Sequence, residues 1–88
     1  MAKEKTVEDT DVKDELKKKL IVWNDEIHSF DFVIEALVTV CDHTLAQAEQ
    51  CTMLIHHKGK CDVKNGTYED LKVMKDQLID KELGVTIE

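Results

Sequence analysis

Apolar and polar positions divide the chain into an N-terminal stretch without an apolar pattern and a remainder with clear periodicity. Residues 1–19 hold six lysines and six acidic residues and almost no large apolar side chain. Such a segment cannot bury enough apolar surface to offset the entropy that it would lose on ordering. We therefore predict a flexible N-terminal tail over residues 1–18 and one folded domain over residues 19–88.

The periodic part begins with a strand and a helix. Residues 20–23 are a continuous apolar run rich in β-branched side chains, which predicts a strand. Over residues 30–41 apolar side chains recur every three or four positions, which is typical of an amphipathic helix. His28 or Ser29 is the predicted N-cap, and residues 42–43 are predicted to end the helix.

A second helix is predicted directly afterwards. Thr44 and Gln47 have the spacing of a capping box, in which each side chain satisfies a backbone N–H of the other residue. Gly59 is the predicted C-terminal stop, and Lys58 precedes it in the last turn. The face predicted to be buried consists of Leu45, Ala48, Thr52 and Ile55.

The last third of the chain predicts a strand, a helix and a strand. Residues 61–63 form a short predicted strand, and the Asn-Gly pair at residues 65–66 predicts a turn. Thr67 is the predicted N-cap of a helix that Gly84 ends, and residues 85–87 predict the last strand. The side chains predicted to face the core from this helix are Leu71, Met74 and Leu78.

These elements follow one another in the order β-α-α-β-α-β, which predicts the α+β class. We expect a single small domain with a mostly antiparallel three-stranded sheet backed by three helices. A domain of this size buries only roughly 60% of the surface that its unfolded chain exposes, so there is little room for a deep catalytic cavity.

The charge and the hydropathy exclude several classes of partner. The chain holds 12 basic and 19 acidic residues, and its net charge of -7 falls entirely on residues 20–88. Duplex nucleic acid requires a basic face, so we expect no nucleic-acid partner. No apolar run approaches the length of a membrane span or of a signal peptide, so we expect a cytoplasmic protein that does not bind membranes. The cysteines expected to be free, buried thiols in that compartment are Cys41, Cys51 and Cys61.

Two polar clusters carry the candidate chemistry. Asn24, Asp25 and Glu26 follow the first predicted strand and offer an amide oxygen and two carboxylates. His56, near the end of the second predicted helix, offers an imidazole nitrogen beside the apolar Ile55. Together these groups suit a peptide α-amino group, which is mostly protonated at neutral pH and presents three N–H donors. The candidates for an adjoining apolar pocket are Phe30, Val33, Thr52 and Ile55.

Plainer interpretations of the same residues stay open. An Asn-Asp pair after a strand is commonly a turn or a cap, and histidines at the end of a helix commonly stabilise its dipole. The cysteines and histidines invite a zinc or a nucleophile hypothesis, but they lack C-x-x-C and H-x-x-x-H spacing. The sequence also lacks a glycine-rich phosphate loop and an oxyanion motif. We therefore expect no metal, no cofactor and no enzymatic activity.

The same segments resemble the ClpS family, whose members are adaptors that carry substrates with destabilising N-terminal residues (N-degrons) to the AAA+ unfoldase of the Clp protease. The resemblance covers roughly residues 18–88 and implies the β-α-α-β-α-β order predicted above. The matching segments are Val22-Trp23-Asn24-Asp25-Glu26, Phe32-Val33-Ile34-Glu35, Ala48-Glu49-Gln50, Ile55-His56-His57-Lys58-Gly59-Lys60 and Thr67-Tyr68-Glu69.

The resemblance implies a non-enzymatic adaptor with two partners. One is a substrate protein that begins with Leu, Phe, Tyr or Trp, and the other is the N-terminal domain of a Clp AAA+ unfoldase, which would engage the tail during hand-off. The implied contacts to the peptide α-amino group are Asn24, Asp25, Glu26 and His56. The implied hydrophobic side-chain pocket consists of His28, Phe30, Val33, Thr52 and Ile55. The implied unfoldase contacts are Glu69, Lys72 and Lys75.

Several positions depart from the family pattern. Glu26 stands where Asp is usual, so its carboxylate reaches one methylene further. His28, Ser29 and Phe30 replace a usual Thr-Pro-Met, and Thr52 replaces a usual Met. The ranking among first residues is therefore left open. The alternative hypothesis is a protein interaction domain of the same fold that does not bind N-degrons.

Overall fold

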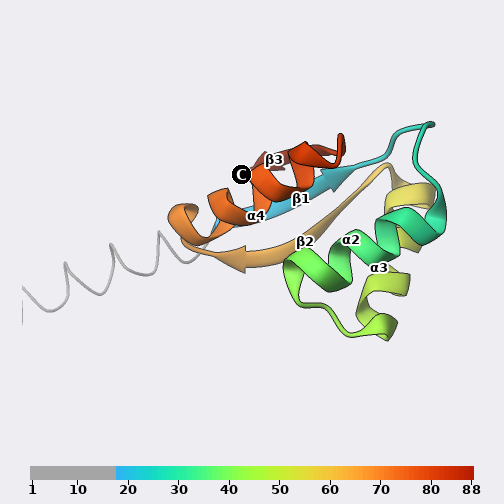
Figure 1. Cartoon of the computed structure of the whole chain (residues 1–88), viewed down its shortest axis with the longest axis horizontal. Helices are drawn as coiled ribbons and strands as arrows, with labels where there is room; N and C mark the ends of the chain where they lie inside the picture. The colour runs from blue at the N-terminus through green and yellow to red at the C-terminus, as the bar shows by residue number, and fades with distance from the viewer. Residues whose placement is uncertain (1–17) are drawn as a thin grey trace, which may run out of the picture.

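Three strands and three helices follow one another in the predicted order, β-α-α-β-α-β, in the computed structural model of the protein (Figure 1). The structure describes residues 18–88. The predicted tail therefore lies outside the described residues, apart from Lys18, which begins the first strand. The elements are β1 (Lys18–Trp23), α2 (Phe30–Cys41), α3 (Leu45–Lys58), β2 (Lys60–Gly66), α4 (Tyr68–Asp80) and β3 (Gly84–Ile87).

The strands form one antiparallel sheet in which β1 lies between β2 and β3. Trp23, the last residue of β1, pairs with Lys60 at the start of β2 and with Gly84 at the start of β3. Leu20 and Val22 share one face of β1 and are both 0% exposed, and Ile21 on the opposite face is also buried, at 7%. β1 thus leads the chain from the centre of the sheet into the loop that precedes α2.

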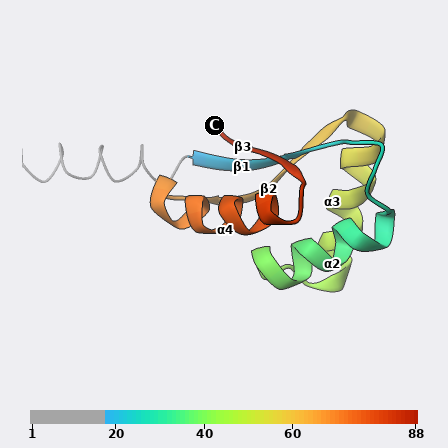
Figure 2. The same ribbon diagram turned by 45° about the horizontal axis from the view of Figure 1, so that its top comes forward.

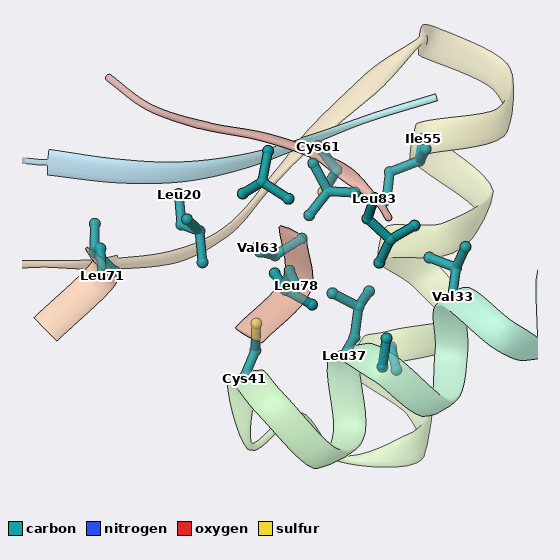
Figure 3. Packing of buried hydrophobic residues seen from close by; sticks show 14 residues of the cluster. Leu20, Val33, Leu37, Cys41, Ile55, Cys61, Val63, Leu71, Leu78 and Leu83 are labelled. Carbon is teal, nitrogen blue, oxygen red and sulfur yellow. The ribbon is translucent and has the colours of Figure 1, made fainter. Parts of the chain in front are cut away.

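α4 packs along one side of the sheet, and α2 and α3 lie side by side at the end of the sheet where β1 leads into α2 (Figure 2). α4 runs along the strands, and α3 packs beside both α2 and β2. All six elements contribute buried side chains to one core (Figure 3). The largest fully buried side chains are Leu20, Val22, Leu37, Cys41, Leu71 and Leu78. The predicted α+β class and the three-stranded antiparallel sheet are confirmed.

Local capping sets the helix ends largely as predicted. The hydroxyls of Ser29 and Thr67 each accept a backbone N–H from the first turn of their helix, at 3.1 and 3.2 Å. Thr44 and Gln47 form the full capping box, with reciprocal hydrogen bonds of 2.9 and 3.1 Å. Gly59 ends α3 in the left-handed region, at φ 92°. The caps supply the acceptors that the first N–H groups of a helix lack.

The predicted turn at residues 65–66 is wrong. β2 continues through both residues, because Gly66 pairs with Lys18 and Asn65 pairs with Lys19. Both pairing partners lie at the N-terminal end of β1. The two lysines there have no apolar pattern that would predict a strand. Pairing therefore extends β2 beyond the predicted residues 61–63.

The predicted end of the last helix is also wrong. α4 ends at Asp80, and Glu82 takes the left-handed conformation that follows it, at φ 66°. Gly84 instead begins β3 opposite Trp23. A Glu in the left-handed conformation has no strong sequence signature, whereas glycine adopts that conformation readily. The sequence pattern therefore favoured Gly84 as the end of the helix.

Burial agrees with the predicted faces with a few exceptions. Leu45 is 62% exposed, whereas the other three residues of its predicted face are buried. Met74 is only partly buried, although it packs against the core. Cys51 is also partly buried, whereas Cys41 and Cys61 are buried, and all three are free thiols.

Candidate functional site

A cavity of about 380 Å³ opens where the end of β1, the start of α2 and the end of α3 meet. Every residue predicted for an α-amino site or a side-chain pocket lines it. The full lining is Val22, Trp23, Asn24, Asp25, Glu26, His28, Ser29, Phe30, Val33, Thr52, Ile55, His56 and Leu83.

The loop between β1 and α2 carries the polar side of this cavity. The Asn24 N–H donates to the Gly59 carbonyl at 2.8 Å, which ties the start of the loop to the residue that ends α3. His56 lies in the last turn of α3, so this hydrogen bond brings the amide and the imidazole to the same wall. The left-handed φ of 92° at Gly59 turns the chain from α3 into β2 and makes the junction possible.

Asp25 shapes the same loop. Its Oδ1 accepts the backbone N–H groups of Ile27 and His28 at 2.9 and 2.8 Å, and its Oδ2 lies 2.8 Å from His28 Nδ1. Burial alone would raise the Asp25 pKa, but the hydrogen bonds from His28 and Ile27 outweigh it, so the pKa is lowered. Asp25 is therefore an anion whose acceptor capacity is largely used within the loop.

Three exposed side chains with acceptor atoms remain at the mouth of the cavity: Asn24, Glu26 and His56. They offer an amide oxygen, a carboxylate and a ring nitrogen. The His56 ring meets Phe30 edge to face, with the ring centroids 5.8 Å apart. The polar and apolar parts of the cavity therefore adjoin at this pair of rings.

The inner wall is apolar. Its buried aliphatic residues are Val22, Val33, Ile55 and Leu83. Figure 3 shows Val33, Ile55 and Leu83 approaching one another from α2, α3 and the segment before β3. Thr52 adds little polarity to this wall, because its hydroxyl donates to a backbone carbonyl of its own helix at 2.7 Å. Phe30, which is 40% exposed, completes the lining nearer the solvent.

Four of the lining residues were not predicted: Val22, Trp23, Ser29 and Leu83. The first three adjoin predicted residues along the chain, so their position was implicit in the motif. Leu83 is remote in sequence and reaches the cavity because Gly84, its neighbour, pairs with Trp23. A single leucine between a helix and a strand has no periodicity that would reveal such a contact.

His28, predicted as a wall of the side-chain pocket, also makes polar contacts. Its Nδ1 faces Asp25, and its Nε2 lies 3.0 Å from the backbone carbonyl of Lys81. The ring stacks on Phe32, with the centroids 4.8 Å apart, and its side chain is 12% exposed. His28 thus touches both the loop before α2 and the turn after α4.

The predicted unfoldase contacts all lie on α4, and none of them lines the cavity. Glu69 and Lys72 are exposed, and Lys75 is partly buried. Lys72 donates to Asp76 at 3.0 Å, and this hydrogen bond and the Asp76 charge raise the Lys72 pKa. The two sets of predicted binding residues therefore occupy separate parts of the surface.

Metal binding, nucleophilic catalysis by cysteine and membrane insertion have less support among residues 18–88. In this part of the chain no three His, Cys, Asp or Glu side chains lie close enough to hold a metal ion. Burial is the main cause that raises the pKa of Cys41 to about 11 and that of Cys61 to about 12, so both are poor nucleophiles at neutral pH. None of the helices described has the length and apolar character needed to cross a bilayer.

Known proteins resemble this chain along most of its length. The family described as ATP-dependent Clp protease adaptor protein ClpS matches residues 13–86. The adapter protein ClpS of Acetivibrio thermocellus is 37% identical over 82 residues, which cover 89% of this chain and 82% of that protein. Its namesake from Campylobacter jejuni (strain 81-176) is 37% identical over 59 residues, covering 67% of this chain. The match spans 62% of the length of that Campylobacter relative.

Two further similarities concern a eukaryotic protein and a solved structure. The mouse E3 ubiquitin-protein ligase UBR1 is 36% identical over 58 residues, which cover 66% of this chain and 3% of that protein. The structure of Agrobacterium tumefaciens ClpS2 bound to L-phenylalaninamide matches with a TM-score of 0.73 and 22% identity, covering 81% of this chain and 93% of that one. At this identity the structural match shows a shared fold.

Proposed function

The chain belongs to the ClpS family of ATP-dependent Clp protease adaptor proteins, and from this premise we propose that it binds the bulky hydrophobic N-terminal residues of substrates and delivers them to a Clp AAA+ unfoldase. The proposed substrates are proteins that begin with Leu, Phe, Tyr or Trp. L-phenylalaninamide, the ligand in the Agrobacterium ClpS2 structure, combines an α-amino group with an aromatic side chain, as such an N-terminus does.

One observation carries this proposal: the cavity joins a cluster of acceptors at its mouth to a buried apolar wall. A simple turn at residues 24–26 would not require the imidazole of His56 beside it. An ordinary core would not require exposed acceptors next to Val33 and Ile55. The combination fits a ligand that is cationic at one atom and apolar within a few bonds of it.

In the proposed complex, Asn24, Glu26 and His56 accept the three N–H groups of the peptide ammonium. Glu26 supplies negative charge at the mouth, and the Asp25 carboxylate adds a second anion behind the loop. These charges have to outweigh the positive end of the α2 dipole, which disfavours a cation nearby. His56 accepts only while its ring is neutral.

The first side chain of the substrate would enter the apolar part of the cavity. Full burial of a Leu or Phe side chain contributes about 1.5–3 kcal/mol. Val33, Ile55 and Leu83 supply the inner surface for that burial, and His28 and Thr52 supply the remaining wall. Phe30 stands between this wall and the His56 ring, so we assign it to the selection among first side chains.

Delivery would use surfaces outside the cavity. Glu69, Lys72 and Lys75 on α4 are the proposed contacts with the N-terminal domain of the unfoldase, and residues 1–17 are the segment proposed to be engaged during hand-off. Because these α4 residues do not line the cavity, we expect that a substrate and an unfoldase domain bind at the same time.

Acetylation of the peptide N-terminus tests the proposal. In fluorescence anisotropy titrations, Leu- and Phe-leading peptides with a free α-amino group should bind, and their acetylated forms should bind at least about tenfold more weakly. Acetylation removes the charge and two donors and leaves a desolvated carboxylate without a partner. A peptide of the same sequence with Ser in first position is the control for the side-chain pocket. Equal affinity for the free and acetylated peptides would refute the proposal and favour an interaction domain without N-degron binding.

A further inference from the structure

We propose that His28 is a positioning residue for this pocket: its imidazole, hydrogen-bonded through both ring nitrogens, links the loop that carries the α-amino acceptors to the turn that carries Leu83. The positioning role rests on the proposed function, since it concerns the fit of a peptide N-terminus. The link itself is a property of the free protein and can be tested without any peptide.

Contacts on both edges of the ring carry the inference. Nδ1 lies 2.8 Å from the Asp25 carboxylate, and Nε2 lies 3.0 Å from the Lys81 carbonyl. Both partners are acceptors, because a carbonyl has no hydrogen to give and the Asp25 carboxylate already accepts two backbone N–H groups. A neutral imidazole has a single N–H. Both hydrogen bonds therefore form only when the ring carries a proton on each nitrogen, as an imidazolium paired with Asp25.

The surroundings of the ring favour this arrangement. The His28 side chain is 12% exposed and stacks on Phe32 at an interplanar angle of 28°, so a cation lies against an aromatic face. Lys81 is the C-cap of α4, and carbonyls at the end of a helix have no partner within the helix. The His28 ring lies 3.0 Å from the Lys81 carbonyl and supplies that missing donor.

The link joins two parts of the cavity that are remote in sequence. Asp25 lies between Asn24 and Glu26, whereas Lys81 lies two residues before Leu83. Holding one segment against the other fixes the distance between the acceptors at the mouth and the apolar wall. A ligand that bridges both is bound best when this distance is set before it arrives.

The hydrogen bonds can be detected directly in the free protein. In a ¹⁵N-labelled sample near pH 6, both ring N–H groups of His28 should give slowly exchanging signals, because each is held by an acceptor. His57, whose exposed ring lies outside the cavity, is the internal control and should give none. A single protected ring N–H, or none, at His28 would overturn the link.

Affinity measurements test the positioning role. His28→Met keeps a side chain of similar size without donors, and we expect it to raise the dissociation constant for a free Phe-leading peptide about tenfold, the loss of a hydrogen bond to a charged group. His28→Gln retains amide donors and should recover part of this loss. Gln77→Met, at an exposed position of α4 that does not line the cavity, is the control and should bind as the wild type does. Thermal unfolding checks that each variant folds.

The outcomes separate the two proposals. Wild-type affinity in His28→Met, or equal losses in the Met and Gln variants, would overturn the positioning role while leaving the proposed function intact. A wild-type protein that binds no free peptide would instead contradict the proposed function and the positioning role together. The ring N–H signals would still decide whether the link exists.

Discussion

At the scale of single residues, the charge of Asp25 bears on both the fold and the cavity. Burial acts to raise its pKa, and the hydrogen bonds from His28 and Ile27 lower it by more, so the folded-state pKa lies below the unfolded value. A group of this kind stabilises the fold above its unfolded pKa, about 3.9 for an aspartate. The stabilisation is lost as the pH falls through the folded-state pKa.

We therefore predict that Asp25→Asn lowers the free energy of unfolding at pH 7 and that the deficit shrinks on acidification. Urea denaturation at pH values from about 7 down to about 2 should show the wild-type and variant curves converging below pH 4, where Asp25 takes up its proton on unfolding and then in the fold. Curves that stay parallel to the lowest pH would mean that the carboxylate hydrogen bonds contribute nothing to stability.

At the same scale, residue types and spacing predicted which side chains line the cavity, but they did not predict which hydrogen bonds those side chains form. Asn24 and His56 belong to motifs that are visible in the sequence, and both line the cavity. The Asp25 carboxylate could have faced a ligand, yet it bonds to its own loop, because the loop conformation places Ile27 and His28 N–H groups within reach. Which hydrogen-bond partner a side chain takes within a loop depends on backbone dihedral angles, and a pattern of residue types does not determine those angles.

Among the helices and strands, prediction succeeded where the determinants are local. Ser29, Thr44 and Thr67 cap the helices by hydrogen bonds within a few residues, so their role was visible in the sequence. The length of β2 and the end of α4 depend on pairing with β1 and on a left-handed Glu82, which are set by the assembled sheet. The position of Leu83 in the cavity was not predicted either, because it too depends on the assembled sheet.

Gly59 connects α3, β2 and the binding loop, and it offers a test of that junction. Gly59→Ala should lower the free energy of unfolding by about 1–2 kcal/mol, because φ 92° is strained for any residue with a Cβ, even though nothing lies within 4 Å of the added atom. Peptide affinity should fall as well, since the Gly59 carbonyl holds the Asn24 N–H.

Gly66→Ala is the matched control in urea denaturation. Its added Cβ would lie 3.8 Å from a Leu71 side-chain carbon, an ordinary contact, and its backbone has no positive φ. We expect a smaller loss of stability and unchanged peptide affinity. A loss as large as that of Gly59→Ala would attribute the effect to glycine replacement in general and not to the left-handed junction.

In the molecule as a whole, the core and the cavity share some of the described residues. The buried cluster draws on every element from β1 to β3, and Val22, Val33, Ile55 and Leu83 belong both to it and to the cavity lining. A substrate side chain would thus be buried against the interior of the domain. The predicted boundary near residue 18 separates this unit from the segment proposed to act in hand-off.

Deletion of residues 1–17 tests that division of labour. We expect the melting temperature and the affinity for a Leu-leading peptide to stay nearly unchanged, because in the described part of the chain the cluster and the cavity draw on residues 20–85 and 22–83. Degradation of a Leu-leading reporter by a Clp unfoldase and its protease should fail. Replacing residues 1–17 by a Gly/Ser segment of equal length is the control. It shows whether delivery depends on the sequence of this segment or only on its length. If truncation instead lowers the melting temperature by several degrees, these residues belong to the folded domain and the predicted boundary is misplaced.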